Sequence, residues 1–376
     1  MTMSRRMVIA GAGATTLALV GGAGCLRVTR RPRTASLPWA LDSKPPADLR
    51  LDALRHAILA PNPHNRQPWL IRLDGKDAAT ISCDLAKLLP DNDSFDRQIT
   101  IGFGTFLELA RIAASQRGVR MDIESFPQGE PQPRLDGRPI AKLRFVADAA
   151  IAKDPLFASI TQRRTNREVY DPDRIVPEAI ARQIADGTYA VGPQMIAAVR
   201  AITVDAMTIE QTTTRTFKES IDLMRIGAEE VDANLDGLSL AGPKMEALKL
   251  LGVLDRSSLG DQSSTAFKTG LEMQQEICGS IPALLWITTP GNSRADQLEA
   301  GRRYVRANLR STMLGVAMHP LSQSLQEYPE TAGRCSEIHK LLGAKEGQRV
   351  QMLARIGYAH PVEPAPRWPL EAHFKT

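Results

Sequence analysis

Two short polar blocks contain the side chains of this sequence that are best suited to hold a ligand. The first, HAILAPNPHNRQPW, covers positions 56–69. Pro61 and Pro63 fix backbone angles and remove amide donors, so the loop can hold Asn65 and Gln67 in set directions. Their amides offer donor and acceptor together, which suits the edge of a neutral heterocycle better than a metal or an anion. The alternative is a turn after a helix, with these amides bonded to local backbone.

The second block, TQRRTNREVY, covers positions 161–170 and brings three arginines together within five residues. The guanidinium groups of Arg163, Arg164 and Arg167 present planar forks that match a phosphate, and Thr165 adds a hydroxyl. The pattern therefore indicates an anion site. The alternative is a basic helix end exposed to solvent.

Apolar periodicity predicts the elements that must position these blocks. A strand–helix plan occurs twice, starting again near Ala147, at low sequence similarity and without a short repeat. Residues 237–262 are irregular, with short helical stretches. Helices are predicted over 48–56, 103–117, 155–164, 177–185, 212–235 and 298–318, and strands over 69–73, 81–83, 121–126, 143–146, 282–288 and 352–358.

Charge and cysteine usage exclude several function classes. The 376 residues have a net charge of +5, but residues 1–36 hold six arginines and no acid. The rest has 41 basic against 42 acidic side chains, which argues against a nucleic-acid partner. The four cysteines form no CxxC pair and the six histidines lack ligand spacing, so neither a disulfide framework nor a metal site is predicted.

The N-terminal stretch SRRMVIAGAGATTLALVGGAGC has two functional interpretations. A dinucleotide fingerprint at Gly11 and Gly13 lacks a polar helix face and a nearby acid. Ser4-Arg5-Arg6 before an uncharged apolar run resembles a twin-arginine export signal, which we favour. Cys25 also faintly resembles a lipoprotein processing site, with cleavage nearby or an uncleaved anchor as alternatives. Residues 26–46 are expected to be an extended linker.

The motif APxxHNxQPW, followed by RRTNR, resembles the nitroreductase superfamily of FMN-binding flavoproteins. In that family the two motifs come in the opposite order, and the flavin lies between two subunits. Here each occurs once, so the chain is similar to the single-chain, duplicated Acg-like branch, with one surviving composite site. The likeness covers most of residues 48–376 and includes DSFDRQITIGFG, from Asp93 to Gly104.

The resemblance implies an α+β fold in which two tandem halves form a pseudo-dimer of mixed sheets flanked by helices. The expected division is an export signal and basic linker over 1–36, a degenerate half over 37–148 and a second half over 149–376. Irregular composition between helical segments suggests a lid over 237–282. Further oligomerisation is left open.

The resemblance also implies which residues hold FMN. Arg163 and Thr165 are expected at the phosphate and Arg167 at the pyrimidine edge, and Arg367 in PAPRWPL corresponds to a C-terminal phosphate clamp. The family loop usually has serine where Asn62 stands. The complete candidate set is Pro61, Asn62, Asn65, Arg163, Arg164, Thr165, Arg167, Ser322, Gln323 and Arg367, with Ser322 and Gln323 near the flavin's reactive nitrogen.

An FMN-dependent oxidoreductase is the function that the family implies. NAD(P)H would act as a transient donor and a nitroaromatic or quinone-like small molecule as acceptor, and the flavin would carry the chemistry without a protein nucleophile. The alternative is an FMN-sequestering protein with little or no NAD(P)H turnover. Export would give a periplasmic or membrane-anchored protein, with membrane association only through its N-terminal segment, and would conflict with a nicotinamide donor. Without the signal it would be cytoplasmic.

Overall fold

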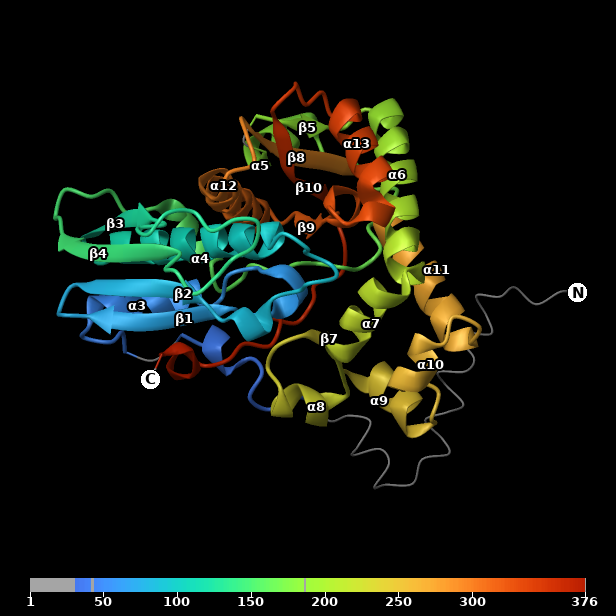
Figure 1. The fold of residues 1–376 in the computed structure, drawn as a ribbon, viewed down its shortest axis with the longest axis horizontal. Helices are drawn as coiled ribbons and strands as arrows, with labels where there is room; N and C mark the ends of the chain where they lie inside the picture. Colours follow the sequence, from blue (N-terminus) through green and yellow to red (C-terminus); the bar gives the residue numbers. More distant parts are fainter. Residues whose placement is uncertain (1–30, 42–43, 186, 376) are drawn as a thin grey trace, which may run out of the picture.

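A computed structural model describes residues 31–41, 44–185 and 187–375, and it confirms the predicted α+β class. Figure 1 shows two sheets with long helices between them and a group of short helices beside them. The expected signal motif and Cys25 lie outside the described residues. Within the described ranges, no helix combines the length and the apolarity needed to cross a bilayer.

The first sheet has the strand order β1-β2-β4-β3, with every pair antiparallel. On β1, Trp69 and Ile71 point into the core because alternate strand residues face the same side. Trp69 packs against Phe103 and Phe106, with ring centroids 5.5 and 4.9 Å away. The elements are α3 (Leu49–Ala57), β1 (Trp69–Asp74), β2 (Ala78–Cys83), α4 (Arg97–Ser115), β3 (Val119–Ser125) and β4 (Ala141–Ala147).

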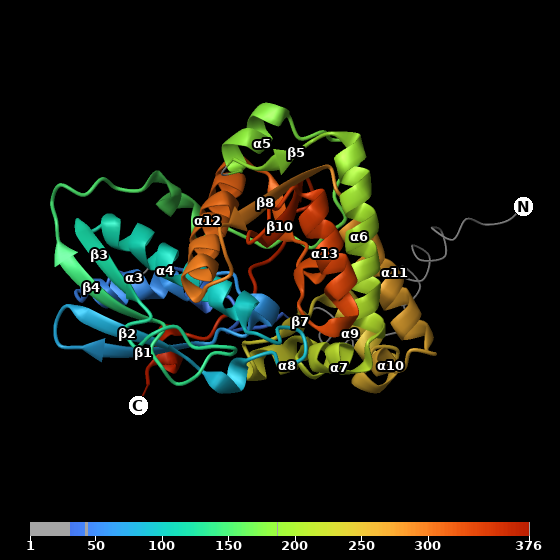
Figure 2. The same ribbon diagram turned by 45° about the horizontal axis from the view of Figure 1, so that its top comes forward.

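The second sheet has the order β5-β8-β10-β9 and is also antiparallel throughout. Its strand β10 is buried along almost its whole length, because helices cover both faces of the sheet. Figure 2 shows α12 on one side, with α6 and α13 on the other. The elements are α5 (Glu178–Ile184), β5 (Tyr189–Ala190), α6 (Pro193–Thr212), β8 (Ala283–Thr289), α12 (Arg294–Met313), β9 (Ala317–Pro320), α13 (Ala332–Leu341) and β10 (Arg349–Gly357).

The chain between α6 and β8 forms a smaller unit of short helices around the parallel strand pair β6–β7. Buried Asp236 attaches this unit to the first half, because its carboxylate accepts from Arg66 and Lys87 at 2.6 Å each. The elements are α7 (Thr214–Asp222), β6 (Met224–Ile226), α8 (Ala228–Ala233), β7 (Leu238–Leu240), α9 (Pro243–Leu250), α10 (Arg256–Gly260) and α11 (Thr265–Gly279).

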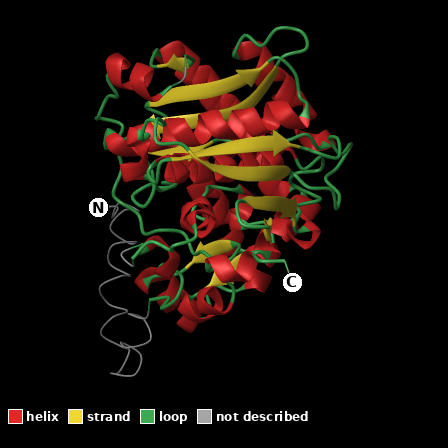
Figure 3. Ribbon diagram, turned by 90° about the vertical axis from the view of Figure 1, so that its left-hand side faces the viewer, coloured by secondary structure: helices red, strands yellow, loops and turns green. Residues whose placement is uncertain are grey.

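Helices lie between the two sheets (Figures 1 and 3). Two of them, α4 and α12, contact each other there at a pair of glycines. A Cβ added to Gly104 would lie 2.1 Å from the carbonyl oxygen of Leu298, and one added to Gly301 would lie 2.0 Å from that of Ile101. No real side-chain atom fits at such distances. The two backbones are therefore in direct contact, and this crossing fixes one sheet relative to the other.

The C-terminal segment returns from the second sheet to the first. Ile71 forms a parallel bridge with Phe374, and the amide of Lys375 donates to the Ile71 carbonyl at 2.8 Å. The last short helix, η7 (Leu370–His373), lies beside β1. This return brings Arg367 to the HAILAPNPHNRQPW loop, although about 300 residues separate the two in the sequence.

Three predictions about local structure are wrong, each at a place where contacts with distant residues determine the backbone conformation. The helix expected over 155–164 is only a 3₁₀ turn, η4 (Pro155–Ser159), and the arginines that follow lie in a loop. The helix expected over 212–235 is divided into α7, β6 and α8, and Gly227 has a φ of 84° at the last break. The expected linker contains η1 (Leu37–Trp39), in which Trp39 is buried.

The glycine crossing gives a direct stability prediction. Gly104→Ala should lower the free energy of unfolding by at least about 2 kcal/mol, because the new methyl must push α12 away. The matched control is Gly270→Ala in α11, where no heavy atom lies within 4 Å, and helix propensity should raise stability by about 0.5–1 kcal/mol. Urea denaturation of both variants measures this. Equal stabilities would contradict the close crossing.

Candidate functional site

The loop after α3 holds three non-glycine residues in the left-handed region. The φ angles are 46° for His64, 53° for Asn65 and 50° for Gln67. Such conformations cost free energy and persist only where surrounding contacts enforce them. Gln67 supplies much of that enforcement: its Oε1 accepts from the Trp368 amide at 2.9 Å, and its Nε2 donates to the Leu235 carbonyl at 2.6 Å.

The amides of Asn62 and Asn65 shape the loop. Asn62 Oδ1 accepts from the Gln67 amide at 2.8 Å, and its Nδ2 donates to the Ala60 carbonyl at 3.1 Å. Asn65 Nδ2 donates to the Pro366 carbonyl at 3.0 Å, and its Oδ1 accepts from Arg367. The turn alternative predicts local backbone bonds for Asn65 and Gln67. Asn65 instead bonds to the distant C-terminal segment, and Gln67 has one local bond, to the Asn65 carbonyl at 3.3 Å, beside its distant ones.

Pro61 and Asn62 lie directly on α4. The Pro61 carbonyl accepts from the Thr105 hydroxyl at 2.7 Å, and a Cβ at Gly102 would stand 3.3 Å from the Asn62 Cβ. The two glycines of the GFG sequence in α4 therefore allow two different close contacts. Gly102 allows close contact with the polar loop, and Gly104 allows close contact with α12.

Arg163, Arg164 and Arg367 gather around one aromatic ring and form what we call the arginine cluster. Their guanidinium carbons lie 5.6, 4.8 and 5.2 Å from the centre of the Trp39 ring. Trp39 is held there because its indole N–H donates to the Ala365 carbonyl at 2.8 Å. Cation–π contact stabilises guanidinium groups at such a ring, but it does not neutralise three positive charges.

The arginine cluster holds a concentration of buried positive charge. Arg163 and Arg367 are each 2% exposed, and no carboxylate of the described residues forms an ion pair with either. Burial lowers the pKa of Arg163 to about 10. Burial, together with repulsion from Arg163 and Arg164, lowers the pKa of Arg367 well below its usual range. The Nε atoms of Arg163 and Arg367 have no hydrogen-bond partner, so the cluster is suited to an anion with several oxygens.

Backbone carbonyls and one amide side chain orient the cluster. The Leu59 carbonyl accepts from Arg163 Nη2 at 3.1 Å and from Arg367 Nη2 at 3.3 Å. From α12, Asn308 Oδ1 accepts from Arg163 at 3.1 Å. The backbone leaves the helical pattern after Arg163, because the Asn166 amide donates to the Met318 carbonyl at 3.1 Å and not to the carbonyl four residues before it. Thr165 is half-buried, and its hydroxyl forms no hydrogen bond with the described residues.

Arg167, the third arginine of the motif, is not part of the arginine cluster. Its guanidinium forms no hydrogen bond or ion pair with the described residues, and its side chain is accessible, yet the surrounding protein desolvates it and lowers its pKa. Its charge acts on His64, Glu210 and His319, and these four residues are called the Arg167 group.

The other members of the Arg167 group are neutral or hydrogen-bonded. Burial lowers the pKa of His64 to about 3, and its Nε2 lies 3.0 Å from the Ser220 hydroxyl on α7. Burial raises the pKa of Glu210, whose oxygens accept from Gln323 and Gln326. Gln323 thus contacts the group, whereas the Ser322 side chain forms no hydrogen bond with the described residues.

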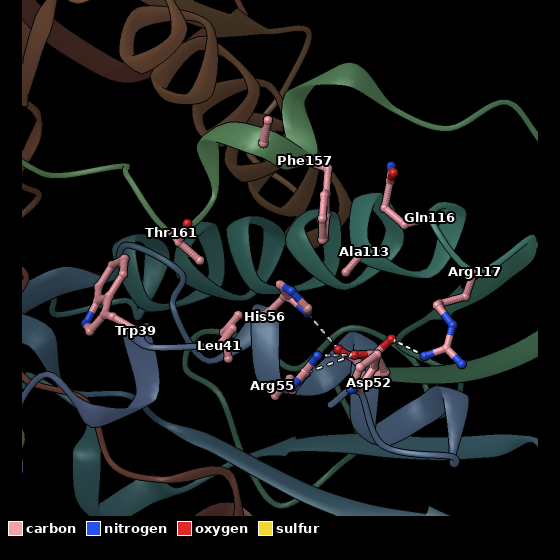
Figure 4. A pocket seen from close by; sticks show the side chains of 12 residues that line it. Trp39, Leu41, Asp52, Arg55, His56, Ala113, Gln116, Arg117, Phe157 and Thr161 are labelled. Atoms are coloured by element: carbon pink, nitrogen blue, oxygen red, sulfur yellow. Dashed lines mark hydrogen bonds and ion pairs between the residues drawn. The ribbon is translucent and has the colours of Figure 1, made fainter. Parts of the chain in front are cut away.

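A cavity of about 470 Å³ lies next to the arginine cluster but does not contain it. Figure 4 shows Trp39 on its wall, together with His56 and Phe157. Asp52 in this wall is paired with Arg55 and Arg117. None of the ten candidate residues lines this cavity. In the described part of the chain, no group of three acidic, histidine or cysteine side chains is arranged to hold a metal.

Sequence patterns missed four residues that build the site. Trp39 was placed in a linker, and Asn308 lies in the middle of an amphipathic helix. Glu210 and His319 were not candidates either, because a single polar residue inside an apolar element gives no local signal. Each becomes recognisable only through its spatial neighbours. The proline and tryptophan around Arg367 were the signals that did locate the C-terminal segment.

No protein-family model matches the chain. The Mycobacterium tuberculosis H37Rv protein named "Putative NAD(P)H nitroreductase acg" is 24% identical over 353 residues, covering 89% of this chain and 97% of the relative. A second protein of that strain with the same description is 25% identical, covering 86% and 90%. A nitroreductase with bound FMN from Desulfitobacterium hafniense has 13% identity and a TM-score of 0.35, with 60% and 99% covered.

The uncompensated charge of the arginine cluster predicts stabilisation by a small oxyanion. Inorganic phosphate at millimolar concentration should raise Tm by about 2 °C or more relative to chloride of equal ionic strength, because phosphate would neutralise buried cations only in the folded state. The Arg163→Met/Arg367→Met variant should lose this response. The control Arg72→Met, at an exposed arginine paired with Asp74, should keep it. An identical phosphate response in all three proteins would contradict an anion site here.

Proposed function

We propose that the protein is an FMN-dependent oxidoreductase of the nitroreductase type. One observation carries this proposal: three arginines from two distant segments surround Trp39, and the two buried ones, Arg163 and Arg367, form no ion pair with a carboxylate of the described residues. The Glu363 carboxylate acts on the half-buried Arg164 without forming an ion pair with it. A phosphate monoester supplies the dianion that such a cluster lacks. The residues present therefore fit the phosphate end of FMN.

Eight of the ten candidate residues receive a role in this proposal. Arg163, Arg164 and Arg367 would hold the phosphate, with the free Thr165 hydroxyl as an additional donor. Arg167 follows Arg163 by four residues, which in extended chain is at most about 14 Å. That span suits a ligand with an anionic tail and a ring, so the Arg167 group would receive the isoalloxazine. Pro61, Asn62 and Asn65 would act mainly by holding the loop beside it.

The bound flavin would supply hydride transfer, which no protein side chain can perform. Arg167 would provide a positive charge that the surrounding protein partly desolvates, and such a charge is effective in stabilising negative charge on a ligand. His64 stays neutral at physiological pH because burial lowers its pKa to about 3. It therefore adds no second cation there.

The mycobacterial relatives support the choice of electron donor and acceptor. Both are named NAD(P)H nitroreductases, so we propose NAD(P)H as the transient donor. A small nitroaromatic or quinone-like molecule is the proposed acceptor. FMN sequestration with little or no turnover is retained as the second candidate, since the arginine cluster explains binding of the cofactor but not its reduction.

Anaerobic reduction separates the two candidates. The full-length protein should be yellow, and NADPH should bleach it rapidly if it is an oxidoreductase, because hydride transfer reduces the isoalloxazine. Bleaching by dithionite but not by NADPH would instead support sequestration. The Arg163→Met/Arg367→Met variant should bind FMN at least tenfold more weakly, since charge-assisted bonds contribute about 1.5–3 kcal/mol each. Undiminished affinity in that variant would refute the proposed phosphate site.

We further propose that residues 237–282 belong to a lid. The supporting observations are that Leu235 accepts from Asn65 and Gln67, and that the Gly237 amide donates to the Asn65 carbonyl at 3.3 Å. The unit is thus attached to the polar loop by few bonds. A single-chain pseudo-dimer remains part of the proposal, because each half contains a four-stranded antiparallel sheet and one of the two crossing helices.

Limited proteolysis tests the lid. FMN should slow cleavage within 237–282, because an ordered ligand would stabilise the loop to which this unit is bonded. Cleavage sites are mapped by mass spectrometry with and without FMN, and cleavage of the exposed turn at Gly75 serves as the internal control. Equal cleavage in both states would argue against a lid.

Export by the twin-arginine route, to a periplasmic or membrane-anchored location, remains a proposal based on Ser4-Arg5-Arg6 and the apolar run that follows. Cell fractionation of an Arg5→Lys/Arg6→Lys variant tests it. An unchanged distribution between compartments would count against export by this route.

A further inference from the structure

We propose that His319 acts in the Arg167 group solely as a hydrogen-bond donor, through Nε2–H, and that Arg355 enforces this role. The ligand atom beside His319 must then be an acceptor, such as a nitro or quinone oxygen. The assignment of the donor follows from the geometry of the two side chains. Only the choice of nitro and quinone compounds as ligands rests on the proposed function.

Cross-strand pairing brings the two residues together. Arg355 on β10 lies directly opposite His319 on β9, and its Nε donates to His319 Nδ1 at 3.1 Å. A guanidinium has donors and no acceptor. The Nδ1 atom must therefore carry the lone pair, and in a neutral imidazole the proton is then on Nε2.

Arg355 cannot easily turn away from this arrangement. It is fully buried, with Nη1 donating to the Ser280 carbonyl at 3.0 Å and Nη2 to the Glu168 carbonyl at 2.8 Å. Its guanidinium carbon also lies 3.8 Å from the centre of the Tyr170 ring. These contacts leave Nε aimed at His319, so Arg355 is a positioning residue.

The doubly protonated form of His319 is disfavoured by its surroundings. An imidazolium would place a proton on Nδ1, facing the N–H of Arg355. The side chain is 8% exposed. Burial and the charges of Arg355 and Arg167 together lower its pKa well below the usual range. His319 therefore does not become a cation when the pH falls moderately.

The proton on Nε2 is available to a ligand. His319 Nε2 forms no hydrogen bond with the described residues. It is also not fully enclosed by them. Arg167 lies close by, because the Asn166 amide donates to the Met318 carbonyl at 3.1 Å, and its guanidinium also has no partner in the described chain. The carboxyl group of Glu210 already accepts hydrogen bonds from Gln323 and Gln326. The Arg167 group thus offers two donors, which favours ligands rich in acceptor oxygens over cations or ligands that only donate.

Nitrogen NMR of the ¹⁵N-histidine-labelled full chain tests the tautomer without any cofactor. The expected result is one Nε2–H signal for His319, assigned by its loss in His319→Asn, without protonation between pH 6 and 8. An Nδ1–H tautomer, or an imidazolium in that range, would overturn the proposal. In Arg355→Met the preference for the Nε2–H tautomer should be lost, and in Arg355→Lys it should be retained. If the Arg355 variants fail to fold, the wild-type spectrum still decides.

Two His319 variants test the donor itself. In His319→Asn the Oδ1 atom can still accept from Arg355, but the donor at the Nε2 position is lost. In His319→Gln an amide N–H reaches that position. Nitrobenzene, which only accepts, should bind roughly two- to tenfold more weakly to His319→Asn than to wild type or His319→Gln. Aniline, whose amine mainly donates, should bind all three alike.

The outcomes separate this inference from the proposed function. Titrations are run on the chain alone and after addition of FMN. If FMN does not bind but nitrobenzene discriminates between the variants, the FMN proposal fails and the donor assignment stands. If FMN binds and the two variants bind nitrobenzene equally, the donor assignment fails alone.

Discussion

The Leu59 carbonyl oxygen is the atom on which the candidate site depends. It accepts hydrogen bonds from Arg163 and from Arg367, and so it joins the end of α3 to two segments that follow much later in the chain. A buried carbonyl can satisfy guanidinium N–H groups, but it cannot cancel their charge. The site is therefore fully assembled and still strongly positive. This imbalance is the physical reason for assigning an anionic ligand to it.

Contacts throughout the fold hold the three arginines together despite their like charges. Direct backbone contact at Gly104 and Gly301 fixes α4 against α12, and α12 supplies Asn308 to orient Arg163. The C-terminal segment crosses back to β1 and carries Arg367 with it. Repulsion among the three arginines is thus opposed by contacts spread over both sheets. A site of this kind can be prepared for its ligand before binding, which reduces the ordering cost of association.

The arginine cluster and the Arg167 group differ in how their charges are arranged. At the arginine cluster, fixed cations face one aromatic ring, which suits a permanent charge such as a phosphate. At the Arg167 group a single accessible cation lies among histidines that burial keeps neutral. That combination suits an uncharged ring whose electron density changes during reaction. The arrangement of donors, more than the net charge, would then select the second ligand.

The sequence by itself determined the polar loop and the arginine motif, because prolines and clustered arginines are local signals, whereas Arg367 and the α+β class came from the family resemblance. Apolar periodicity also located most of the strands, since it depends on neighbouring residues alone. Tertiary structure decided that the arginine motif leaves the helix, because the Asn166 amide donates to the distant Met318 carbonyl and not to a helical partner. It also decided that Asn62 serves its own loop and that Trp39 and His319 belong to the site. Those roles arise from partners far away in the chain, and no local pattern of residue types encodes such partners.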